Sequence, residues 1–174
     1  SSPICRTQAT KISMKRIIPI VFVAVLLSSC LETQSHYTPE IATSKFVTNH
    51  GDTLKFRFDE LSGLYNLDSL HVGDTITGAV GFASLGNNLL SAHVAWDSTR
   101  VRVWSEFTPD VLNVLLSNSD TAALNLYLPI GYNYLGFPLY LVPRQAGSTS
   151  LKLTVVTDSK YSPAEENLVL NIVQ

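Results

Sequence analysis

The chain contains few cysteines: Cys5 and Cys30 are the two among 174 residues. Small exported domains that depend on disulfide bonds carry about four or more cysteines at characteristic spacings, which this chain lacks. Cys5 precedes Met14 in a segment that we interpret as an upstream extension, so Cys30 is the one cysteine of the expected mature chain. That mature chain has 145 residues (174 − 29 = 145), which is long enough to bury a core without disulfide bonds.

Positive charge is also scarce. The chain has 12 Lys and Arg residues against 14 Asp and Glu residues. Four basic residues and no acidic ones precede Cys30, so the mature net charge is 8 − 14 = −6. The remaining basic residues form no patch. This excludes a nucleic-acid-binding protein and argues against electrostatic attachment to anionic lipid.

Motifs for catalysis and metal binding are missing. Ser84 lies in GFASLG, but Phe82 stands where the nucleophile elbow G-x-S-x-G has its first glycine, and no helix pattern follows. The four histidines lack the spacing of metal ligands, and the acidic residues between 52 and 74 do not follow the D-x-D-x-D-G pattern of a calcium loop. We therefore predict a protein that is not an enzyme and has no catalytic residue, metal site or cofactor.

The longest apolar run is too short to span a membrane. It covers residues 17–27, eleven residues interrupted by Pro19, whereas a spanning helix needs about 20. Lys15 and Arg16 precede it, which is the organisation of a secretory signal peptide. The run ends in LSSC (residues 27–30), an aliphatic residue and two small residues before a cysteine. This ending resembles the lipobox of bacterial lipoproteins.

The resemblance implies a lipid anchor. Residues 1–13 are an upstream extension, and residues 14–29 are the signal peptide. The family implies lipidation of the Cys30 thiol, cleavage before Cys30 and acylation with palmitate-like chains, which attach a protein to a membrane without a spanning helix. The polar residues 30–40 then form a tether. Leu31 follows the cysteine in place of the Asp that retains some lipoproteins in the inner membrane, so we expect the outer membrane.

Residues 41–174 carry the pattern of short strands. Apolar and polar residues alternate with period two, and turn signals such as HGDT, VGDT and LGNN separate the runs. This predicts an all-β fold, an antiparallel immunoglobulin-like β-sandwich of about seven to nine strands. The runs are TLKFRF (53–58), DTITGAVGFAS (74–84), LLSAHVAW (89–96), RVRVW (100–104), TAALNLYLP (121–129), FPLYLVP (137–143), STSLKLTVV (148–156) and NLVLNIV (167–173).

Two segments fit more than one structure. Residues 59–71 suit either a loop or a short helical turn. Residues 108–117 suit a helix capped by Thr108 with Pro109 at its first position, or a strand, and we favour the strand.

The later part of the domain resembles bacterial immunoglobulin-like domains. The stretch PRQAGSTSLKLTVVTDS followed by NLVLNIV is similar to their last two strands, and HVAWDS is similar to their central strand that carries a tryptophan. The cysteine pair of antibody domains is absent. The resemblance implies a sandwich fold.

Aromatic residues are the candidate binding groups. Tyr132, Tyr134 and Phe137 lie in the stretch LPIGYNYLGFPLY between glycine and proline residues. Such rings either pack over the end of the sandwich, as the alternation of Tyr132 and Tyr134 favours, or form a platform for a ligand. Trp104 is a second candidate, because it is in phase with exposed arginines and forms an apolar patch if Phe107 joins it.

Two functions follow from these features. The first is a lipid-anchored envelope module that binds a glycan or another surface component through the tyrosine-rich loop. The second is a periplasm-facing accessory subunit of an envelope complex, which contacts a protein partner at Trp104 and an edge strand. A barrel that encloses a ligand is disfavoured, because large aliphatic residues occupy the inward positions.

Overall fold

The computed structural model describes residues 37–174, without the side chain of Asp68. The predicted signal peptide, Cys30 and most of the predicted tether lie outside these residues. The described part contains twelve strands and one helix in this order: β1 (Glu40–Thr43), β2 (Phe46–Thr48), β3 (Thr53–Leu54), β4 (Phe56–Asp59), β5 (Leu64–His71), β6 (Ile76–Ala83), β7 (Leu89–Trp96), β8 (Val101–Trp104), α2 (Pro109–Val114), β9 (Asn125–Tyr127), β10 (Tyr134–Pro143), β11 (Gly147–Thr157) and β12 (Ala164–Val173).

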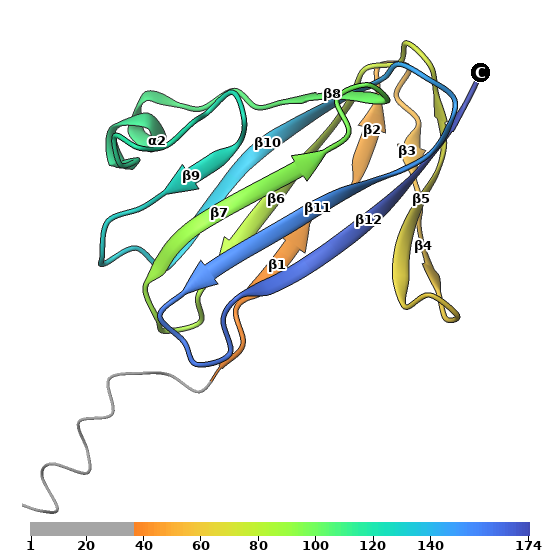
Figure 1. The fold of residues 1–174 in the computed structure, drawn as a ribbon. Helices are drawn as coiled ribbons and strands as arrows, with labels where there is room; N and C mark the ends of the chain where they lie inside the picture. The colour runs from red at the N-terminus through yellow and green to blue at the C-terminus, as the bar shows by residue number, and fades with distance from the viewer. Residues whose placement is uncertain (1–36) are drawn as a thin grey trace, which may run out of the picture. The chain divides into compact units, whose positions relative to one another are not determined.

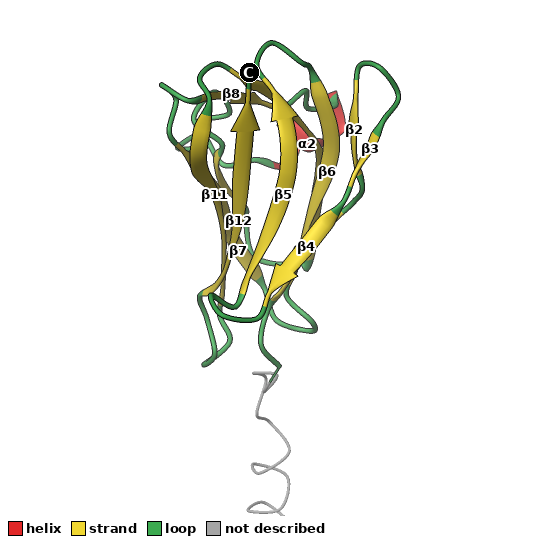
Figure 2. Cartoon of the chain, turned by 90° about the vertical axis from the view of Figure 1, so that its right-hand side faces the viewer, coloured by secondary structure: helices red, strands yellow, loops and turns green. Residues whose placement is uncertain are grey.

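The strands form two six-stranded sheets that face each other (Figures 1 and 2). Sheet A has the order β3-β2-β6-β10-β8, with β1 paired to β6 beside β2. Sheet B has the order β4-β5-β12-β11-β7-β9. The predicted all-β sandwich is therefore confirmed.

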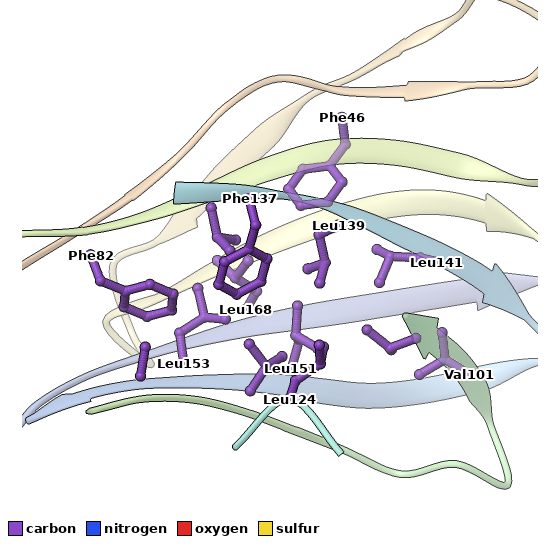
Figure 3. Close-up of a cluster of buried hydrophobic side chains, with 14 of the residues drawn as sticks. Phe46, Phe82, Val101, Leu124, Phe137, Leu139, Leu141, Leu151, Leu153 and Leu168 are labelled. Carbon is purple, nitrogen blue, oxygen red and sulfur yellow. The ribbon is translucent and has the colours of Figure 1, made fainter. Parts of the chain in front are cut away.

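The core fills the space between the two sheets. Alternate residues of β10 point inward (Leu135, Phe137, Leu139, Leu141), and all four are buried. They meet leucines of sheet B, such as Leu151 of β11, across the interface (Figure 3). The period-two alternation read from the sequence is the direct cause, because successive side chains of a strand point to opposite faces of the sheet.

The strands are more numerous than predicted. The run 53–58 does not form one strand: β3 pairs with β2 in sheet A, whereas β4 pairs with β5 in sheet B. The chain therefore changes sheets at Lys55. Period two continues through this change, so the sequence pattern gives no sign of it.

Residues 59–71 were predicted as a loop or a short helical turn, but most of them form a strand. A turn at residues 60–63 leads into β5, which pairs with β12 in parallel. This is the one parallel pair in the described part of an otherwise antiparallel architecture. Leu67 and Leu70 of β5 are fully buried, because β5 forms part of the wall of the core.

The preference for a strand at 108–117 was wrong. Residues Pro109–Val114 form α2, and the Thr108 hydroxyl accepts a hydrogen bond from the Val111 N–H. Proline at the first turn and an acidic residue, Asp110, complete a favourable helix start. The segment connects β8 at one edge of sheet A to β9 at the edge of sheet B, and Val111 packs against the core.

Candidate binding face

The structure separates the three aromatic residues of the tyrosine-rich stretch. Phe137 is 4% exposed and belongs to the core, where its ring centroid lies 5.9 Å from that of Phe82 and 5.2 Å from that of Phe107. Tyr134 is 61% exposed and lies on the outer face of sheet A. Packing is thus the role of Phe137, and its inclusion among the candidate binding residues was wrong. The two tyrosines remain at the surface.

Tyr134 lies across two glycines. Gly136 of β10 and Gly81 of β6 are direct partners in the ladder. A Cβ built on Gly136 would stand 2.5 Å from the Tyr134 hydroxyl oxygen, and a Cβ on Gly81 would stand 2.8 Å from the same oxygen. Because neither glycine has a side chain, one face of the Tyr134 ring lies against sheet A, and the other face is exposed to solvent.

Hydrogen bonds to the start of β7 and the end of β6 hold the loop before β10. The Leu89 N–H donates to the Tyr132 carbonyl at 2.7 Å, and the Ser84 N–H donates to the Asn133 carbonyl at 2.9 Å. The Asn88 side chain accepts from the Gly131 N–H at 2.9 Å. These bonds fix the backbone on which the Tyr132 ring is presented.

A shallow hollow of about 300 Å³ separates these tyrosines from α2. Asp110 is its one charged lining group. The lining is otherwise apolar or aromatic, with Tyr134 and Gly136 on one side and α2 on the other. The residues are Asp110, Val111, Val114, Leu128, Tyr132, Tyr134, Leu135 and Gly136.

Trp104 occupies the same outer face, farther along β10. It pairs with Tyr140 in the ladder, and the two rings stack with a centroid distance of 5.2 Å and an interplanar angle of 15°. The Arg102 guanidinium lies 4.8 Å from the Trp104 ring centroid. The expected patch of Trp104 with Phe107 is wrong, because Phe107 turns inward to Phe137.

We call this surface the β10 face. Tyr134 and Tyr140 are six residues apart on the same side of β10, which places them about 20 Å apart along the strand. Small side chains lie between them, so the surface is smooth. The β10 face comprises Tyr134, Gly136, Pro138 and Tyr140 of β10, Ala79 and Gly81 of β6, and Trp104 of β8.

Two other groupings bring titratable residues together. At one end of the domain the Asp74 carboxylate lies 3.3 Å from His50 Nε2 and 4.0 Å from His71 Nδ1. Spacing along the chain could not reveal this, because the histidines are 21 residues apart. Among residues 37–174, no three His, Cys, Asp or Glu side chains are arranged to hold a metal ion.

The second grouping is a hollow of about 340 Å³ at the edge between the sheets. Ile41, Phe56, Tyr65 and Glu166 contribute to its lining. Partial burial raises the pKa of the Glu166 carboxyl above its usual value.

The glycines under Tyr134 are the functional signal that reading the sequence missed. Gly81 and Gly136 are 55 residues apart, and each alone reads as a strand glycine. Glycine inside a strand marks a close approach of another group, but only the ladder shows that one ring covers both.

Comparisons with known proteins identify no family for this chain. No family model and no curated protein matches the chain. A structure of domains 4 and 5 of the S-layer protein SbsC is 16% identical with a TM-score of 0.34, and the alignment covers 74% of this chain and 54% of that one. A family 123 glycoside hydrolase from Clostridium perfringens is 9% identical with a TM-score of 0.39, over 79% and 28% of the two chains. The secreted serine protease VesC from Vibrio cholerae is 10% identical with a TM-score of 0.28, over 68% and 23%.

The chain thus spans about half of the SbsC structure and a smaller share of the other two. Among residues 37–174, no helix is long and apolar enough to cross a membrane.

Proposed function

We propose that this protein is a lipid-anchored, non-catalytic module of the bacterial cell envelope that binds a glycan on its β10 face. The observation that carries the proposal is the Tyr134 ring, which rests on Gly81 and Gly136 and leaves its other side exposed. A large exposed ring suits recognition better than packing, because packing would have buried it.

The chemistry of the β10 face suits a sugar ring. A pyranose presents C–H groups on its faces and hydroxyl groups at its edges. The C–H groups gain dispersion contacts over an aromatic ring, and the hydroxyls need a few polar groups at the rim. Tyr134 offers the ring, and the Asp110 carboxylate beside it is an acceptor.

The length of the β10 face favours an extended ligand. Small residues between Tyr134 and Tyr140 allow a chain to lie close to the sheet, and the Trp104–Tyr140 stack stands at the far end with Arg102 beside it. An oligosaccharide that spans both ends would contact two aromatic positions about 20 Å apart.

The binding test uses the full lipidated chain in detergent and an array of neutral and acidic oligosaccharides. Tyr134→Ala should weaken binding about 2- to 10-fold, the equivalent of an aromatic contact of about 0.5–1.5 kcal/mol. Gly136→Ala should also weaken glycan binding, because the added Cβ displaces the Tyr134 ring. The ring itself stays chemically intact in this variant.

The matched control is Phe58→Ala, which removes an exposed ring from sheet B. Binding that survives both β10-face variants, or that Phe58→Ala reduces equally, would contradict the proposed site.

The lipid anchor is tested separately. An alkyne analogue of palmitate, fed to cells, should label the wild-type chain and fail to label Cys30→Ala. Protease added to intact cells then reports the orientation: cleavage means that the domain faces outward, where a surface glycan is accessible.

A second candidate function is an accessory subunit that pairs with a protein strand. β8 pairs with β10 only from Tyr140 to Pro143, so no strand of the described part pairs with the first half of β10 on that side. An extended segment could add there, since strand addition uses backbone groups. This candidate is favoured if another protein co-purifies in a stoichiometric amount after mild detergent extraction and still co-purifies with the Tyr134→Ala variant.

A further inference from the structure

One end of the sandwich includes three loops that hydrogen bonds connect to one another and to the first described residue. The Ser159 hydroxyl donates to the Tyr37 carbonyl at 2.9 Å. The Asp158 carboxylate accepts from the Asn88 N–H at 2.8 Å, and Asn88 in turn binds the Gly131 N–H. These bonds join residues 84–88, 128–133 and 158–163 to Tyr37. We call this the N-terminal end (Figure 1).

The N-terminal end exposes large apolar and aromatic side chains. Ile130 is 81% exposed and Tyr37 is 66% exposed, and Leu85 and Tyr161 are exposed as well. The Lys160 ammonium lies 5.1 Å from the Tyr161 ring centroid. Each loop therefore presents at least one such side chain to the surroundings.

Leu85 is unusual in its backbone. Its φ is 51°, a left-handed conformation in which glycine or asparagine is favoured and leucine is strained. Leu85 is also 43% exposed, so its side chain adds to the apolar surface of this end.

The opposite end of the sandwich is polar. Its loops carry the His50–Asp74–His71 grouping and the Asp97–Arg100 ion pair. The exposed apolar side chains there, Val72 and Val173, are smaller. The N-terminal end is thus the more apolar of the two, as a membrane-facing surface is, and the opposite end is polar, as a water-facing surface is.

We propose that the N-terminal end docks onto the lipid bilayer to which the chain is anchored. This rests on the proposed lipidation of Cys30. Tyr37 is seven residues after Cys30, and a fully extended chain over seven residue steps spans at most about 25 Å. The lipid therefore holds this end at high effective concentration beside the bilayer.

The residue types of the N-terminal end suit the membrane–water interface, where such docking would place them. Tyrosine is enriched at membrane–water interfaces, where Tyr37 and Tyr161 would lie with their hydroxyls toward water. Lysine near an interface extends its ammonium toward the headgroups, which suits Lys160. Ile130 and Leu85 would enter the apolar edge. The β10 face would then stand upright on the membrane, with Tyr134 at its lower end and Tyr140 away from it.

The test places a fluorophore at each end. The lipidated chain, in which Cys30 carries the lipid, receives one further cysteine as Ile130→Cys or, as the matched control, Val72→Cys. Each is labelled with an environment-sensitive nitrobenzoxadiazole group and reconstituted into vesicles of phosphatidylethanolamine and phosphatidylglycerol. The label at 130 should shift to shorter wavelength, brighten several-fold and be quenched by spin-labelled lipid, whereas the label at 72 should do none of these.

A second variant removes one contact without disturbing the fold. Leu85→Asn suits the left-handed backbone, and combined with the label at 130 it should reduce the brightening. A chain that remains on the vesicles with equally wet labels at 130 and 72 would overturn docking while leaving the anchor intact. A chain that leaves the vesicles, with Cys30 open to thiol reagents, would overturn both. Brightening that follows the protein-to-lipid ratio would mean that a second copy covers this end, which also overturns the proposal.

Discussion

Two alanine substitutions three residues apart in β10 should have very different costs. Phe137 points into the core, and its ring packs against Phe82 and Phe107. Tyr134 points outward and is mostly exposed. The sequence offers both as members of one aromatic cluster, so the comparison tests the assignment of each side chain to its face of sheet A.

The magnitudes follow from burial. Removing a buried phenylalanine ring costs about 3–5 kcal/mol of unfolding free energy, through lost apolar contacts and the cavity left behind. For a domain of roughly 140 residues, 1 kcal/mol corresponds to about 4 °C in melting temperature. Phe137→Ala should therefore lower the melting temperature by about 10–20 °C. Tyr134→Ala should cost no more than about 1 kcal/mol, or about 4 °C.

Thermal melts and urea titrations followed by circular dichroism measure both variants. Coincident transitions by two probes establish two-state unfolding, and an unchanged urea slope shows that the difference lies in stability. Equal losses for the two variants, or a larger loss for Tyr134→Ala, would refute the placement of the two rings.

Two further predictions concern the core and its edge. Gly78→Ala places a Cβ 2.6 Å from Phe46 Cδ1, so it should lower the free energy of unfolding by about 1–3 kcal/mol through overpacking. Gly81→Ala should lower it less, because its Cβ meets the surface ring of Tyr134, which can move. Thermal melts compare the two variants, and equal losses of stability would contradict the packing. Because burial raises the folded-state pKa of Glu166, the folded chain binds its proton more tightly, and stability falls as pH rises from the usual value of 4.5 through the folded-state pKa. Glu166→Gln should therefore be more stable than the wild type at pH 7 in urea titrations, with an advantage that shrinks toward pH 4.5 and below; an advantage constant from pH 4 to pH 7 would point to a different cause.

The strand pattern was readable in several strands that have one buried face, although not in β5. The inward positions of β6 (Ile76, Gly78, Val80, Phe82) are all buried, as the alternation predicts. Val101 and Val103 of β8 point inward and Arg102 outward, again as predicted. The pattern was less informative at short elements. Residues 108–117 have no long apolar period, so the local capping by Thr108 decided in favour of the helix.

The candidate site was only partly predictable. Tyr132 and Tyr134 were singled out from the sequence, and the structure places both at the hollow beside α2. Phe137 was grouped with them because it is close in the chain, although its parity along β10 differs from that of Tyr134. The glycines beneath the ring come from two strands, and the sequence of one strand does not predict which distant strand pairs with it.

The sequence by itself determined the class of the fold, because period-two alternation and frequent turn signals are local properties that one chain displays. It also carried the lipobox resemblance, which is a linear motif and needs no folding to be read. The tertiary structure alone decided which residues become neighbours. It moved the chain between sheets at Lys55, set β5 parallel to β12, and brought Gly81 under Tyr134. These outcomes depend on strand order and register, which arise from burying the whole set of apolar faces at once.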